Sequence, residues 1–158
     1  TDYLAYFDGY LGNYYLILCF PEIWSYELFE MHVSSTRHMT DYEPYEGRKT
    51  YADNTAGGFY TVRLGILEKL KELKKQGSVL ALRFITGDYT LPLGVWVTLE
   101  ATRKAMNSKP IEFSSRELML EYAKKLAKRK FNFDLESILD GSILLKNMKQ
   151  QSKLVKFL

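Results

Sequence analysis

The 158-residue sequence contains one cysteine, Cys19, and two histidines. A single cysteine excludes an internal disulfide, and so few sulfur and imidazole groups exclude a closed zinc site of the usual four-ligand kind. The sequence also lacks an apolar run long enough to span a bilayer and lacks the features of a signal peptide. We therefore expect a cytoplasmic protein with no membrane partner. Because an initiator Met is missing as well, we expect the C-terminal part of a longer protein.

The charge is unevenly distributed along the chain. Residues 1–102 carry 9 Lys and Arg against 13 Asp and Glu, whereas residues 103–158 carry 13 Lys and Arg against 6 Asp and Glu. Such asymmetry indicates an anionic partner for the second part, and DNA is one candidate. A solvated basic helix face explains the same pattern, and the sequence leaves both interpretations open.

Strand and helix patterns alternate along the chain. Apolar, β-rich runs predict strands at 14–20, within 24–33, at 78–86 and at 93–97. Apolar residues at helical spacing predict helices at 55–76, 99–107, 114–130 and 134–139, with Ser114 and Glu117 as a capping box and Leu118, Tyr122 and Leu126 facing inward. Residues 34–54 show little periodicity and predict a long loop.

These elements predict an α/β or α+β fold, a mixed sheet flanked by helices. We expect one mixed domain at 1–141 and a flexible C-terminal tail at 142–158.

The last eight residues, Gln151 to Leu158, follow the pattern Gln-x-x-Leu-x-x-Phe-Leu. Residues three apart share one side of a helical or 3₁₀ turn, so Leu154 and Phe157 would form one apolar plug. Gln151 offers both a donor and an acceptor to a polar pocket. The pattern resembles the box with which partners of archaeal and eukaryotic PCNA sliding clamps bind, although Leu158 stands where a second aromatic is commonest. The alternative is the last turn of a helix packed on the core.

The segment 41–52 gathers carboxylates, basic residues and tyrosines just before a glycine-opened helix. Its candidate site residues are Asp41, Tyr42, Glu43, Tyr45, Glu46, Arg48, Lys49, Tyr51, Gly57 and Gly58. One interpretation is a nucleic-acid or phosphate site, in which basic residues contact phosphate, tyrosines stack on bases and the glycines allow close approach to free N–H groups. Another is a divalent-metal site at Asp41, Glu43 and Glu46, with His38. The third is a loop held by internal ion pairs and tyrosine hydroxyls.

The string DYEPYEGRKTYA, followed by AGGFYTVRLGILEKLKELKKQGSVLALRFI and LPLGVWVTLEATRKAM, resembles the C-terminal region of the archaeal Nre family. The resemblance covers residues 11–106 and resumes at the tail. It implies a role in DNA repair and a clamp-binding motif at the C-terminus. Family members carry a further N-terminal region with a cysteine cluster, which this sequence lacks. The resemblance supplies no catalytic residues.

Our leading hypothesis is therefore an archaeal DNA repair factor that the PCNA clamp recruits to the nucleoid. The rival is a metal- or nucleotide-dependent enzyme acting on nucleic acid, with its site in residues 41–60. A scaffold without chemistry is the third. The sequence leaves open whether the protein is an enzyme.

Overall fold

A computed structural model describes residues 2–87 and 94–156. Within these residues, six strands form one mixed sheet in the order β4-β3-β5-β2-β1-β6. Neighbouring strands are antiparallel except β3 and β5, which run parallel. The strands are β1 (Tyr3–Tyr10), β2 (Asn13–Phe20), β3 (Tyr26–His32), β4 (His38–Glu43), β5 (Ser78–Ile85) and β6 (Ile111–Phe113).

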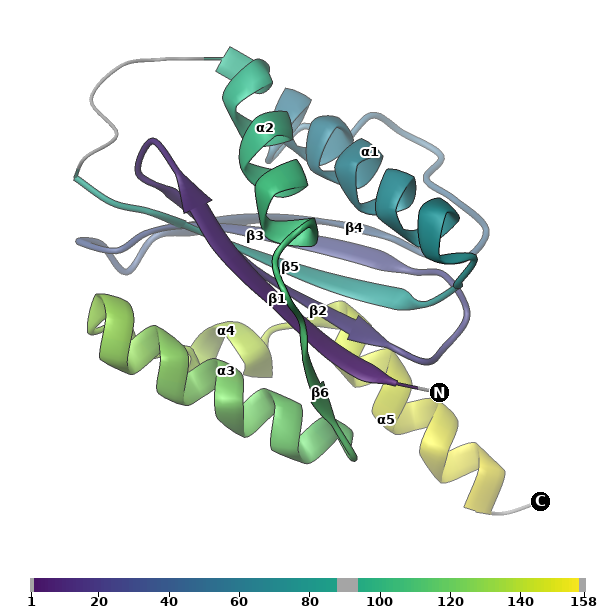
Figure 1. Ribbon diagram of the computed structural model, residues 1–158. Helices are drawn as coiled ribbons and strands as arrows, with labels where there is room; N and C mark the ends of the chain where they lie inside the picture. Colours follow the sequence, from purple (N-terminus) through teal and green to yellow (C-terminus); the bar gives the residue numbers. More distant parts are fainter. Residues whose placement is uncertain (1, 88–93, 157–158) are drawn as a thin grey trace.

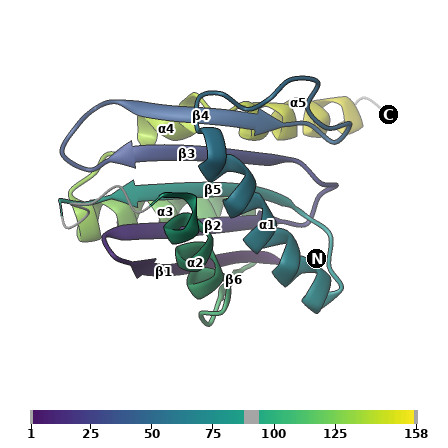
Figure 2. The same cartoon turned by 90° about the horizontal axis from the view of Figure 1, so that it is seen from above.

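Helices cover both faces of the sheet (Figures 1 and 2). One layer holds α1 (Ala56–Leu73) and α2 (Gly94–Met106). The other holds α3 (Arg116–Phe131), α4 (Glu136–Asp140) and α5 (Ile143–Lys156). Side chains of successive strand residues point to opposite faces, so each layer has its own apolar core. In β5, Leu80 and Leu82 pack under α3 to α5, while Val79 and Ala81 pack under α1 and α2.

The predicted mixed sheet flanked by helices is confirmed. The apolar runs of β2 and β5 lie at the centre of the sheet, and every residue of β5 is buried. Cys19 is buried too, and burial raises the pKa of its thiol to about 12. None of the described helices is long and apolar enough to cross a membrane.

Four local predictions need correction. Strand β4 lies inside the predicted loop 34–54. Its polar sequence does not indicate a strand, but antiparallel pairing with β3 supplies its backbone hydrogen-bond partners. Residues 94–97 begin helix α2 rather than a strand. Helix α3 is capped by Ser115, whose hydroxyl accepts from the Leu118 amide, and not by Ser114. Leu118 is exposed, and Met119 faces the core in its place.

The predicted tail is helical from Ile143 to Lys156, and its first turns belong to the core. Leu144, Leu145 and Met148 are buried against the sheet. The folded domain therefore extends past residue 141. The C-terminal end of α5 projects past the strands of the sheet (Figure 1).

Candidate functional site

Two residues of the C-terminal motif lie on the projecting end of α5. Gln151 is exposed, and the side chain of Leu154 is 66% exposed. The two residues are three apart in a helix, so they share one side, as the sequence predicted. Phe157 and Leu158 lie outside the described residues.

A groove of about 340 Å³ separates this end of α5 from the end of β4 and the segment that follows it. Gln151 and Leu154 line one wall, and Tyr42, Tyr45 and Glu46 line the other. The Asn147 side-chain amide donates to the Tyr42 hydroxyl across the groove at 3.1 Å. The fold thus brings the predicted motif next to part of the predicted 41–52 site, although about a hundred residues separate them in sequence.

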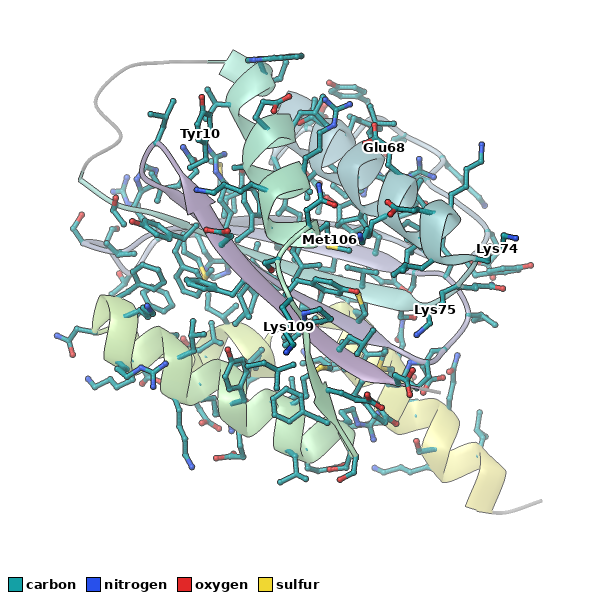
Figure 3. All side chains as sticks on the ribbon, in the orientation of Figure 1. Tyr10, Glu68, Lys74, Lys75, Met106 and Lys109 are labelled. Atoms are coloured by element: carbon teal, nitrogen blue, oxygen red, sulfur yellow. The ribbon has the colours of Figure 1, made fainter. Side chains whose placement is uncertain are left out.

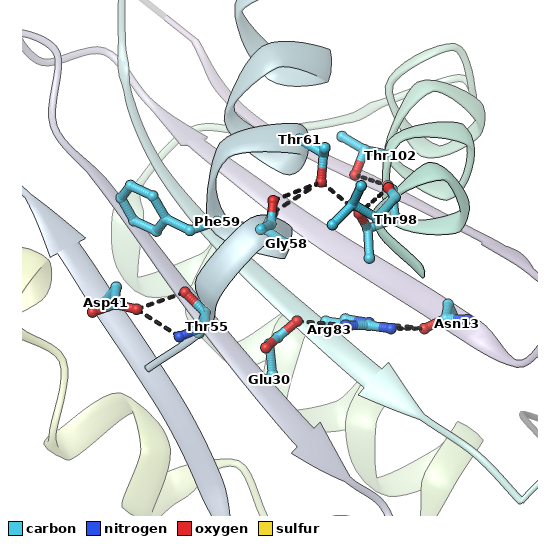
Figure 4. A network of polar contacts seen from close by, with 12 residues as sticks. Asn13, Glu30, Asp41, Thr55, Gly58, Phe59, Thr61, Arg83, Thr98 and Thr102 are labelled. Atoms are coloured by element: carbon cyan, nitrogen blue, oxygen red, sulfur yellow. Dashed lines mark hydrogen bonds and ion pairs between the residues drawn. The ribbon is translucent and has the colours of Figure 1, made fainter. Parts of the chain in front are cut away.

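Asp41, however, faces the opposite layer and caps α1. Its Oδ2 accepts from both the backbone N–H and the hydroxyl of Thr55 at 2.7 Å (Figure 4). Asn54 donates to Oδ1 at 3.3 Å. A carboxylate at a helix N-terminus complements the helix dipole and satisfies free N–H groups. Asp41 therefore places a negative charge at the N-terminus of α1, where it would repel a second anion.

Glu43 points to the same layer and is also engaged. Its two oxygens accept from Arg63 Nε at 2.9 Å and Nη2 at 3.1 Å. The Trp24 indole N–H donates to Oε2 at 2.6 Å. This bidentate pair joins β4 to α1, while Tyr42, between the two carboxylates, points to α5 because side chains alternate along a strand.

Arg48 uses its guanidinium to hold the connection between β4 and α1. It donates to the carbonyl oxygens of Tyr42 at 2.7 Å, Thr50 at 3.1 Å and Tyr51 at 3.3 Å. The Tyr51 ring stacks on Tyr60, with ring centroids 4.9 Å apart. Lys49 is exposed. These contacts match the third interpretation of the segment, a loop held by internal polar contacts.

A metal site finds no support in the described part of the chain. No group of three or more His, Cys, Asp or Glu side chains comes together there. Asp41 and Glu43 are engaged with α1, Glu46 lines the α5 groove, and His38 packs against Phe29 with ring centroids 5.7 Å apart.

The glycines of α1 serve helix packing. A Cβ on Gly57 would lie 2.4 Å from the Val95 side chain of α2, and one on Gly65 would lie 2.8 Å from that of Thr102. Between these positions, the hydroxyls of Thr61 and Thr98 are hydrogen-bonded (Figure 4). Gly58 lies against the Glu30 carboxylate. The predicted ligand approach at Gly57 and Gly58 therefore meets a neighbouring helix and a carboxylate.

Two buried carboxylates of β3 were missed at the sequence level. Glu30 forms an ion pair with Arg83 of β5 at 2.5 Å, and Arg83 also donates to the Asn13 side chain (Figure 4). Glu27, on the other face, accepts from the Ser142 hydroxyl at 2.5 Å and from the Ile143 and Leu144 amides. Burial raises the pKa of the Glu27 carboxyl, and these hydrogen bonds oppose the rise. The sequence signal that could have revealed Glu27 and Glu30 is the presence of charged residues inside an otherwise apolar strand.

The family model described as archaeal Nre, C-terminal, matches residues 43–157. The DNA repair protein NreA of Archaeoglobus fulgidus is 34% identical over 128 residues, which cover 77% of this chain and 32% of that protein. NreA of Haloferax volcanii is 34% identical over 110 residues, which cover 63% of this chain and 26% of that protein.

The DNA repair protein NreB of A. fulgidus is 32% identical over 144 residues, which cover 86% of this chain and 35% of NreB. The chain thus spans about a third or less of the length of these relatives. The family match includes residues 107–150, where the sequence resemblance was least distinctive. No solved structure gives a significant match.

Proposed function

This chain belongs to the archaeal Nre family, and we propose that it serves DNA repair as the segment that docks a longer protein on the PCNA sliding clamp. The names of the relatives, DNA repair protein NreA and NreB, support the repair context. Because clamps work on chromosomal DNA, the proposal places the protein in the archaeal cytoplasm, at the nucleoid.

The observation that carries the proposal is the exposure of Gln151 and Leu154 at the end of α5. Gln151 and Leu154 protrude beyond the sheet, and the sequence continues the same spacing to Phe157. A leucine that keeps 66% of its side chain in water gains little from the domain core. Binding to a clamp pocket would bury that surface at about 25 cal/mol per Å² without breaking the fold.

The core-facing turns of α5 hold Gln151 and Leu154 on a helix that is anchored to the domain. Met148 and Leu144 are buried one and two turns before Gln151. A docked motif would therefore hold the domain close to the clamp, because a short helix restricts orientation more than a flexible linker does.

The test is calorimetric titration of the 158-residue chain into an archaeal PCNA. Replacement of both Leu154 and Phe157 by alanine removes the apolar anchors. Anchors of this kind contribute about 2 kcal/mol each, so we expect affinity to fall roughly 100- to 1000-fold. Gln150→Ala is the matched control, because Gln150 is exposed on the same helix and lies outside the motif. It should leave affinity within about twofold.

Unchanged binding by the double variant would contradict the proposal, as would equal losses in the double variant and the control. The rival hypothesis, a metal- or nucleotide-dependent enzyme with its site in 41–60, gains no support from the contacts of Asp41, Glu43 and Arg48. Each of these side chains is engaged within the fold.

A further inference from the structure

Two adjoining depressions run along the layer formed by α3, α4 and α5. The first, of about 280 Å³, lies between α3 and α5. The second, of about 350 Å³, lies between α3 and the segment that leads into α4. They adjoin at Lys124 and Glu136, which line both, and we refer to the two together as the track. Its basic residues are Arg116, Lys124, Lys125, Lys128, Lys146 and Lys149.

The track carries an excess of positive charge. Three carboxylates, Asp134, Glu136 and Asp140, line it together with the six basic residues. Lys124 is neutralised by Glu121 and Glu136 at 3.2 and 3.3 Å, and these hydrogen bonds raise its pKa.

The other lysines of the track are Lys125, Lys128, Lys146 and Lys149. Within the described chain they form no ion pair. Each is exposed. Solvent and salt therefore screen much of their charge.

The arrangement of side chains on α5 separates two surfaces. Leu144, Met148, Gln151 and Leu154 line the groove on one side of the helix. Lys146 and Lys149 line the track on another. A protein docked through the end of α5 would consequently keep the track open to the DNA that the clamp encircles.

We infer that this track binds the phosphate backbone of duplex DNA without reading its sequence. Exposed lysines on two helices, α3 and α5, can contact successive phosphates of a DNA backbone. Bases of a single strand would need exposed aromatic platforms. The one aromatic residue of the track, Phe133, is half-buried and packs edge-on against Phe84. The inference deepens the proposed repair function and rests on it for its context only.

The inference also moves the expected DNA contact away from residues 41–60. There, Arg48 is engaged by three carbonyl oxygens, and Asp41 and Glu43 would repel phosphate. The sequence of the second part of the chain, with its excess of Lys and Arg, agrees with the new position.

The test measures binding of a labelled duplex by fluorescence anisotropy between 50 and 200 mM salt. In the track variant, Lys125, Lys128, Lys146 and Lys149 are replaced by Gln. Four phosphate contacts predict a log–log salt slope of about −3.6, which is an affinity loss of about 150-fold across this range. We expect the track variant to lose most of that slope and to bind at least about tenfold more weakly at 50 mM salt.

The control variant carries the same charge change elsewhere, with Gln at four exposed lysines: Lys49, Lys71, Lys74 and Lys104. Lys74 lies at the end of α1, in the opposite layer (Figure 3). It should keep the wild-type slope. Equal weakening of both variants would overturn the inference, because net charge and not the track would then explain binding. A wild-type slope in the track variant would overturn it as well.

The two proposals separate in the same assays. The track variant should still bind the clamp, and the variant altered at Leu154 and Phe157 should still bind DNA. Loss of clamp affinity in that variant with its DNA affinity retained would support both. DNA binding without any clamp binding by the wild type would refute the docking proposal and leave the track intact.

Discussion

Glu27 joins the sheet to α5, the helix that carries Gln151 and Leu154. Its carboxylate accepts from the Ser142 hydroxyl at 2.5 Å, the Ile143 amide at 3.1 Å and the Leu144 amide at 3.4 Å. Glu27→Ala leaves these donors without their acceptor in a buried position. We expect the first turn of α5 to loosen and the whole domain to lose stability.

The size of the effect follows from the donors. An unsatisfied buried donor costs about 1–3 kcal/mol, and the Leu144 contact is long and weak. Release of the buried charge offsets part of the loss. We therefore expect Glu27→Ala to lower the free energy of unfolding by about 3 kcal/mol. For a domain of this size that corresponds to a fall in Tm of about 6–12 °C.

Urea unfolding followed by tryptophan fluorescence measures the global loss, and hydrogen exchange locates it. Amides of residues 143–148 should lose more protection than those of α1. The control is Glu72→Ala, because Glu72 is exposed and forms a surface pair with Lys69. Such pairs contribute about 0–1 kcal/mol. A loss for Glu27→Ala no larger than the control would refute the anchoring role.

The same carboxyl predicts a pH effect. Burial raises its pKa in the folded state, so its contribution to stability is fully present below the unfolded pKa, near 4.3, and is lost as pH rises through the folded pKa. Glu27→Gln removes this titration. The stability of the wild type relative to Glu27→Gln should therefore decline as pH rises from about 4. A difference that is constant or grows with pH would contradict the assignment.

Two further substitutions test the fold. Leu11, with φ of 51°, and Gly12, with φ of 76°, form the turn after Tyr10 (Figure 3). Two positive φ angles favour Asn-Gly in such a turn, so Leu11→Asn should raise the free energy of unfolding by about 0.5–1 kcal/mol. A lower Tm for the variant would contradict this prediction. Gly65→Ala forces α1 away from Thr102 and should cost about 1–3 kcal/mol in urea unfolding. Thr102→Ser removes the clashing methyl group, so the double variant should recover part of that loss, and no recovery would exclude the proposed contact.

Much of the sheet and several helices could be predicted from patterns that local physics produces. The run 78–86 predicted a central strand, observed at Ser78–Ile85, because a strand covered on both faces needs apolar side chains throughout. The apolar stripe from Phe59 to Leu70 predicted α1 because one helix face meets the core. Strand β4 was missed because its sequence is polar and its stability comes from pairing with β3.

The roles of the polar residues could not be predicted, because they depend on partners distant in sequence. From the sequence, Asp41 and Glu43 were candidates for a ligand-binding loop. In the fold they are engaged by Thr55 and Arg63 instead. Gly57 was a candidate for an anion site at the start of α1, but the Val95 side chain of α2 covers it. Strand alternation decided that Tyr42 faces α5 while its two neighbours face α1.

The sequence by itself determined the family, the mixed sheet and the spacing of the C-terminal motif, since each rests on the identity and order of nearby residues. Tertiary structure alone decided that Leu144, Leu145 and Met148 belong to the core and that Lys125 and Lys146 line adjoining depressions. The physical reason is that burial and charge proximity depend on which surfaces the fold brings together, and Glu27, in a strand far from α5 in sequence, fixes that contact.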